Sequence, residues 1–84
     1  MNNEQTTTFL GTERTLRYTF KDSKILAYAT YDTFSLSLLV IFHNGTQYEY
    51  SGVDELTWNE FINANSAGSY FNTVIRKFNY QRLK

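Results

Sequence analysis

The first half of the chain contains stretches in which apolar and polar positions alternate, the period-two pattern of half-buried β-strands, and one continuous apolar run at residues 38–42. In the clearest stretch, Leu16, Tyr18 and Phe20 are separated by single polar residues. We therefore predict four strands, at residues 14–21, 24–31, 35–43 and 46–51. The third of these is the most apolar, as is typical of a central strand. Strict alternation along the second places Ile25 on the same face as Tyr31.

The dipeptide Asn44-Gly45 is the strongest turn signal in the sequence. It favours a two-residue hairpin turn in which both residues have positive φ. The third and fourth predicted strands should therefore pair antiparallel on either side of it.

The second half of the chain changes to a helical period. Asp54 is suited to cap a helix that runs to about Asn65 and whose apolar residues, Trp58 among them, share one face. Ser66 is suited to cap a second helix. Its apolar stripe consists of Tyr70, Phe71, Val74, Ile75 and Phe78. Because strands come first and helices last, we predict an α+β fold: an antiparallel β-meander of about four strands followed by two helices packed on one face.

Length and composition indicate one small domain. A chain of 84 residues has room for a single core. It has no cysteine, and residues 1–5 are polar and acidic where a secretory leader would be basic and then apolar. We therefore expect a cytoplasmic protein without a membrane segment. We divide it into a polar tail at residues 1–12, with a short strand near residues 8–10, and one domain at residues 13–84.

The sequence offers little for catalysis. His43 is the only histidine, and it falls at the end of a predicted strand beside a turn, with no cysteine to act with it. Asp54 and Glu55 are adjacent carboxylates, but at a helix start they complement the helix dipole. No His, Asp or Glu spacing is typical of metal ligands. We predict that the protein is not an enzyme and uses no metal or cofactor.

The net charge is zero, but the charges are segregated. Every Lys and Arg lies either between Arg14 and Lys24 or between Arg76 and Lys84. In the stretch between these segments, all Asp, Glu, Lys and Arg positions are acidic. If the two basic segments meet in space, they form one positive face for a short phosphate-bearing ligand. The alternative is structural, because basic residues also favour helix C-termini and exposed strand edges.

Two features of the second half are candidates for binding. The small-residue segment 66–69 contains Gly68 and begins a predicted helix, where exposed backbone N–H groups can hold an anion. A capped helix after a tight helix–helix joint explains the same residues. Tyr48 and Tyr50 share one face of the last predicted strand, where they form either a platform for a base or part of the core.

Together these residues resemble the KTSC domain, a family named after the C-terminus of some lysyl-tRNA synthetases and also found as short stand-alone bacterial and phage proteins. The resemblance rests on Tyr48-Glu49-Tyr50 and on the pattern S-x-G-x-x-F-N-x-x-I-R at residues 66–76, and it covers about residues 23–83. The chain departs from the family where proline is frequent. Those positions hold Asp54, Asn65 and Asn79.

The resemblance implies a binding module, with RNA binding proposed from the synthetase context. The motif positions that we predict to bind the ligand are Tyr48, Tyr50, Ser66, Gly68, Asn72 and Arg76. We predict a non-catalytic module for a phosphate-bearing ligand, either a nucleotide or a single-stranded nucleic acid, and a phage copy would sequester a nucleotide signal. The alternative is a protein-interaction or homo-oligomerisation module that uses the many aromatic residues and the extra N-terminal strand.

Overall fold

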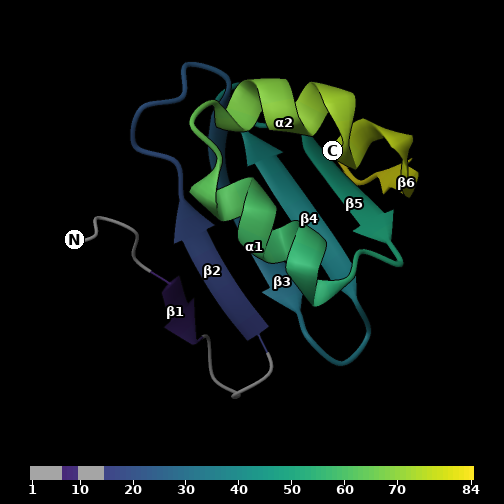
Figure 1. The fold of residues 1–84 in the computed structure, drawn as a ribbon. Coiled ribbons are helices and arrows are strands. Elements are labelled where there is room, and N and C mark those ends of the chain that lie inside the picture. The colour runs from purple at the N-terminus through teal and green to yellow at the C-terminus, as the bar shows by residue number, and fades with distance from the viewer. Residues whose placement is uncertain (1–6, 10–14) are drawn as a thin grey trace.

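The computed structural model describes residues 7–9 and 15–84. Within these residues, six strands form one antiparallel sheet in sequence order, and the helical segments lie between the fifth and sixth strands (Figure 1). The elements are β1 Thr7–Phe9, β2 Thr15–Thr19, β3 Leu26–Asp32, β4 Ser37–Phe42, β5 Gln47–Ser51, α1 Glu55–Asn63, α2 Ala67–Thr73, the 3₁₀ turn η1 Ile75–Lys77 and β6 Asn79–Arg82. Residues 1–6 and 10–14, which include most of the tail predicted at residues 1–12, fall outside the described residues.

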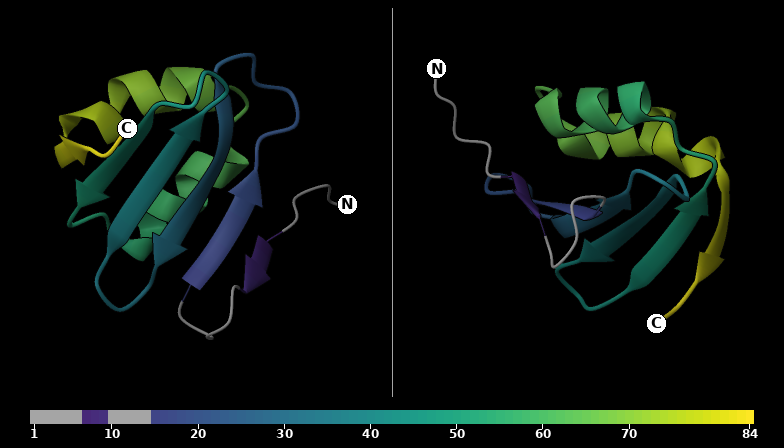
Figure 2. Two further views of the ribbon diagram at one scale, coloured as in Figure 1. Left: turned by 180° about the vertical axis from the view of Figure 1, so that it is seen from behind. Right: turned by 90° about the horizontal axis from the view of Figure 1, so that it is seen from below.

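Both helices cover the same face of the sheet, and no helix of the described chain covers the other face (Figure 2). This arrangement confirms the predicted α+β meander with two helices on one face. The short strand predicted near residues 8–10 corresponds to β1, which pairs with β2 at one edge of the sheet.

The C-terminal segment corrects the predicted second helix. α2 ends at Thr73, and the chain then forms η1 and the edge strand β6. Thr73, Val74 and Ile75 are three consecutive β-branched residues, which disfavour continuation of a helix. Tyr80 and Arg82 lie on one face of β6, opposite Tyr50 and Tyr48 of β5 respectively. The apolar period over residues 70–78 is therefore real, but only its first half is α-helical.

The Asn44-Gly45 turn joins β4 and β5 as predicted, but its loop is one residue longer. The Phe42 N–H donates to the Thr46 carbonyl at 2.9 Å, which leaves three residues in the loop. Of these three, only Gly45 has positive φ, at +92°. Glycine in this conformation is typical of a three-residue hairpin loop. The Asn44 side chain accepts a hydrogen bond from the Thr46 N–H at 2.9 Å.

A β-bulge moves Ile25 away from its predicted face. The pairing of β3 with β4 shifts register between Leu26 and Tyr28, so Ala27 is the extra residue. The bulge turns Leu26 toward the core, where it is fully buried with Tyr31, and leaves Ile25 56% exposed. Strict alternation along this strand was therefore the wrong prediction.

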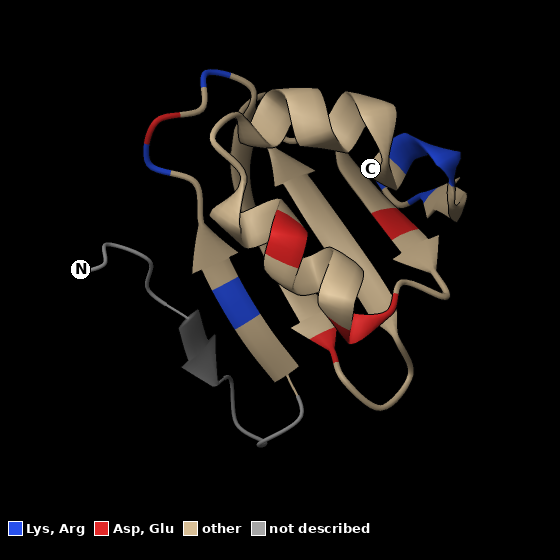
Figure 3. Cartoon of the chain, viewed as in Figure 1, with Lys and Arg blue, Asp and Glu red and all other residues tan. Residues whose placement is uncertain are grey.

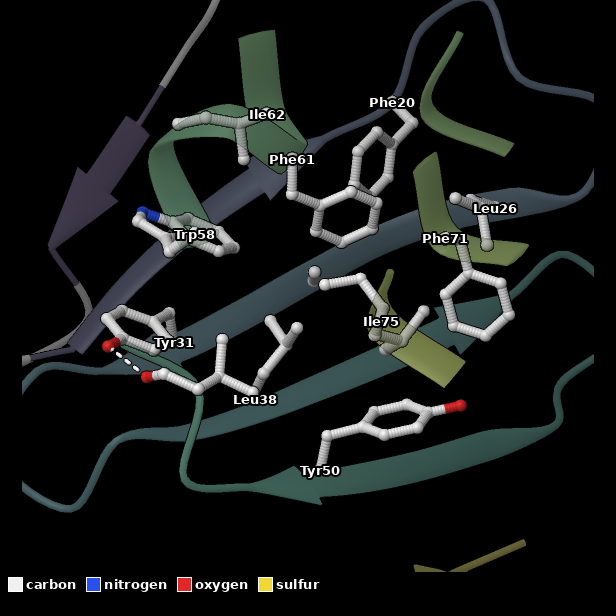
Figure 4. Close-up of a cluster of buried hydrophobic side chains, with 13 residues drawn as sticks. Phe20, Leu26, Tyr31, Leu38, Tyr50, Trp58, Phe61, Ile62, Phe71 and Ile75 are labelled. Atoms are coloured by element: carbon white, nitrogen blue, oxygen red, sulfur yellow. Dashed lines mark hydrogen bonds between the residues drawn. The ribbon is translucent and has the colours of Figure 1, made fainter. Parts of the chain in front are cut away.

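Aromatic side chains fill much of the space between sheet and helices (Figure 4). The Trp58 ring stacks on Tyr31 with ring centroids 5.2 Å apart, and the ring centroids of Phe61 and Phe20 are 5.1 Å apart. The Tyr31 hydroxyl donates a hydrogen bond to the Val53 carbonyl. Burial of Tyr31 raises its pKa to about 12, so this hydroxyl remains a donor at neutral pH.

The two predicted helix caps are confirmed. The Asp54 carboxylate accepts a hydrogen bond from the Thr57 N–H at 2.9 Å, and hydrogen bonding by the Thr57 side chain and backbone lowers the pKa of Asp54. The Ser66 hydroxyl accepts one from the Ser69 N–H at 3.2 Å. These caps fix where α1 and α2 begin.

Replacing Gly45 with alanine should lower the free energy of unfolding by about 1–2 kcal/mol, because a Cβ is strained at φ +92°. The matched control is Gly68→Ala in α2, where the backbone is helical and the Cβ also meets no atom within 4 Å. That change should stabilise the protein by about 0.5–1 kcal/mol. Urea unfolding of both variants measures these two changes in stability. Equal free energies of unfolding for the two variants would contradict a positive φ at Gly45.

Candidate functional site

Four of the six predicted site residues meet in one pocket of about 480 Å³. Side chains from β4, β5, α2, η1 and β6 surround it. We call it the aromatic pocket, and its lining residues are Phe42, Tyr48, Tyr50, Phe71, Asn72, Arg76 and Tyr80.

Strand alternation and register bring the three tyrosines together. Tyr48 and Tyr50 point toward the helix-covered face of β5, whereas Glu49 between them points away. Tyr80 lies opposite Tyr50 across the β5–β6 pair, with ring centroids 5.8 Å apart. It also contacts Tyr48 edge-on at 5.6 Å. Tyr80, a residue that is 60% exposed, forms the open side of the pocket.

Phe71 of α2 forms the wall of the pocket opposite β5 and β6. Phe71 packs edge-on against Phe42 and Tyr50, with centroids 5.3 Å and 5.8 Å apart (Phe71 and Tyr50 are drawn in Figure 4). This contact holds the end of α2 over β4 and β5, so that Asn72 and Arg76 reach the same cavity. Arg76 Nη1 donates a hydrogen bond to Asn72 Oδ1 at 3.3 Å, which orients the guanidinium along the wall.

The Tyr50 hydroxyl and the Arg76 guanidinium give the pocket its polarity. Tyr50 is only 3% exposed, and burial together with nearby Tyr48 raises its pKa to about 12, against an opposing effect of Arg76. The hydroxyl is therefore protonated at neutral pH and can donate a hydrogen bond. Within residues 15–84 this hydroxyl has no hydrogen-bond partner, and Arg76 has no carboxylate partner. Both groups are free to contact an anion.

The other two predicted residues, Ser66 and Gly68, lie elsewhere. They line a separate hollow of about 630 Å³ between the β2–β3 loop and the α1–α2 joint, which shares no residue with the aromatic pocket. The Ser66 hydroxyl is already used to cap α2. The structure thus divides the predicted set into a pocket of four residues and a helix start of two.

The described basic residues do not form the single positive face considered from the sequence. Lys21 and Lys24 lie in the β2–β3 loop, while Arg76 and Arg82 lie at the opposite side of the sheet (Figure 3). Strands β3, β4 and β5 separate the two groups. Only the C-terminal group is next to the aromatic pocket.

Three lining residues of the aromatic pocket were not predicted: Phe42, Phe71 and Tyr80. The first two carried a core pattern, and they serve both as core and as lining. Tyr80 was missed because no strand was predicted after the helices. The signal was present in the alternation of Tyr80 and Arg82 with two amide residues.

His43, the only histidine of the chain, contacts a neighbouring loop. His43 Nε2 lies 3.0 Å from the Ser23 carbonyl oxygen, a contact that joins the β4–β5 turn to the β2–β3 loop. Among residues 7–9 and 15–84, no three His, Asp or Glu side chains come close enough to share a metal ion. No helix within the same residues has the length and apolar character to cross a bilayer.

Comparison with known proteins adds a family to this geometry. The KTSC domain family matches residues 22–80, a range that contains the whole aromatic pocket and begins after β2. The crystal structure of a KTSC domain protein from Yersinia pestis is similar, with a TM-score of 0.74 and 29% sequence identity over 83% of this chain and 99% of that chain. No curated protein matches the sequence significantly.

Ionisation of Tyr50 should destabilise the fold above pH about 10. In the unfolded chain this hydroxyl loses its proton near pH 10, and in the folded protein it does so near pH 12. Its contribution to stability is therefore complete below pH 10 and is lost as the pH rises through 12. Tyr31 and Tyr70, whose pKa values are also raised to about 12, act in the same direction.

The variant Tyr50→Phe keeps the ring and removes the titrating group. Its stability should fall less than that of the parent between pH about 10 and about 12, by about 3 kcal/mol at most. Urea unfolding at a series of alkaline pH values measures the difference. Parallel curves for parent and variant would show that the Tyr50 pKa is not raised.

Proposed function

This chain belongs to the KTSC domain family, and within it we propose the role of a non-catalytic module that binds a phosphate-bearing ligand in the aromatic pocket. The ligand class is a nucleotide or a single strand of nucleic acid. The observation that carries the proposal is the meeting of three tyrosines with Arg76 around one cavity. Planar aromatic surface beside a guanidinium matches a ligand that has a planar base and an anionic group.

The dimensions of the pocket support a ligand of nucleotide size. Its volume of about 480 Å³ lies within the range of about 300–1,000 Å³ that is usual for small-molecule sites. Tyr80 is exposed and Tyr48 is half-buried, so their rings offer accessible faces, whereas Tyr50 offers its hydroxyl. Stacking of one base on a tyrosine contributes about 1–3 kcal/mol and tolerates any base.

Cations flank the aromatic surface where a phosphate would lie. Arg76 lines the cavity, and Arg82 lies opposite Tyr48 on the same face of the β5–β6 pair. Guanidinium groups bind phosphate oxygens through paired N–H donors. The neutral Tyr50 hydroxyl adds a further donor. We place this binding in the cytoplasm, and in a phage-encoded copy binding without turnover would sequester a nucleotide signal.

Replacing Arg76 with alanine should weaken binding of short single strands and make it less dependent on salt. Loss of one phosphate contact reduces the slope of log affinity against log salt by about 0.7. Fluorescence anisotropy with labelled short RNA and single-stranded DNA, and calorimetry with linear and cyclic nucleotides, measure the affinities. For a mononucleotide the salt slope should be shallower.

The matched control is Lys24→Ala, which removes one charge from the basic residues of the β2–β3 loop, away from the aromatic pocket. It should leave both affinity and salt slope nearly unchanged. Melting temperatures of both variants separate loss of binding from loss of fold. If the parent protein shows no saturable, salt-sensitive binding to any of these probes, the proposal is wrong and the protein-interaction role replaces it.

A further inference from the structure

The uncovered face of the sheet carries a regular pattern of side chains. One register row crosses β2 to β6 at Arg17, Thr30, Leu39, Glu49 and Gln81. The neighbouring row contains Thr19, Tyr28, Ile41 and Gln47. Seen from behind, these strands have no helix over them (Figure 2).

The charges on this face are arranged with opposite signs on its two sides. Arg17 lies on β2 and Glu49 on β5, in the same row, with Thr30 and Leu39 between them. Strands are about 4.8 Å apart, so the two charged residues are separated by about 14 Å and cannot pair within one chain. Among the described residues neither has an oppositely charged partner.

The centre of the face is apolar and ordered. Arg17 lies with its guanidinium carbon 3.8 Å from the centroid of the Tyr28 ring, so the cation is held against the sheet. Tyr28 and Leu39 are half-buried, and Ile41 is 7% exposed although no helix of the described chain lies over it. In these two rows the face therefore combines a mainly apolar middle with one cation on β2 and one anion on β5.

We propose that this face is the interface of a homodimer in which two sheets pack face to face about a two-fold axis. The axis runs parallel to the strands, between β3 and β4. Rotation about it places β2 of one copy opposite β5 of the other. Arg17 then meets Glu49 of the second copy, and this contact occurs twice. Tyr28 in the same arrangement faces Ile41 of the second copy.

The charge pattern selects a second copy of the chain as the occupant. Each side of the face carries the charge opposite to that on the other side, so the rotation brings the cation of one copy to the anion of the other. A partner that carries only one sign of charge would be repelled on one side. Face-to-face sheets pack about 10 Å apart, a distance that Arg and Glu side chains span together. The apolar centre supplies the attraction, and the two ion pairs fix the register.

The dimer leaves the aromatic pocket open. Glu49 points to the uncovered face, whereas its neighbours Tyr48 and Tyr50 point to the helix-covered face. Each dimer would therefore present two pockets on its outer surfaces. The dimer does not depend on the proposed ligand, and either proposal can fail without the other.

Charge reversal tests the pairing directly. Sedimentation equilibrium should show a concentration-dependent dimer for the parent protein. Arg17→Glu or Glu49→Arg alone should raise the dimer dissociation constant by at least about 100-fold, because each places like charges in contact twice. An equimolar mixture of these two variants should form a heterodimer, since every contact between the different chains is again attractive. Native mass spectrometry distinguishes that heterodimer by its mass.

The control is Lys24→Glu, a reversal in the β2–β3 loop that should leave the dissociation constant unchanged. Arg17→Glu also removes the contact with Tyr28, whereas Glu49→Arg leaves it in place and tests the same pairing. The proposal is overturned if the parent protein is monomeric at its highest soluble concentration. It is equally overturned if the single variants dimerise like the parent, or if their folded mixture stays monomeric.

Discussion

The contact of Phe71 with Phe42 and Tyr50 determines where α2 lies on the sheet. Both contacts are edge-on, with ring centroids within 6 Å, and they tie the helix to β4 and β5 at once. Helix α2 is short, and after it the chain returns to the sheet within a few residues. It joins the sheet as β6, beside β5. The aromatic pocket is the space that this return encloses, with Arg76 on its wall. Its existence therefore depends on one buried phenylalanine.

Alternation along β5 assigns different roles to neighbouring residues. Tyr48 and Tyr50 belong to the helix-covered face and to the aromatic pocket, while Glu49 belongs to the uncovered face. The same separation holds on β2, where Tyr18 packs against the core and Arg17 lies on the uncovered face. The proposed ligand and the proposed second copy would thus use opposite faces of one sheet, without competition between them.

Local pattern predicted most of the fold, and long-range pairing accounts for what it missed. Period-two alternation and the caps at Asp54 and Ser66 depend on neighbouring residues, so the sequence contains them directly. The alternation at residues 79–82 indicates a strand, but its pairing with β5, which sets Tyr80 opposite Tyr50, depends on residues far apart in sequence. The separation of Gly68 from the aromatic pocket likewise depends on which side of the sheet each end of α2 reaches.

Chemical-shift mapping by NMR tests the central claim most directly, because it reports where a ligand binds without prior choice of a residue to change. We predict that a mononucleotide or short RNA shifts the backbone signals of Tyr48, Asn72 and Tyr80 and the side-chain Nε signal of Arg76, in a saturable manner. Signals of Lys24 and Gly68, which lie at the other hollow, should stay in place. Shifts confined to that hollow, or no saturable shifts at all, would contradict the account.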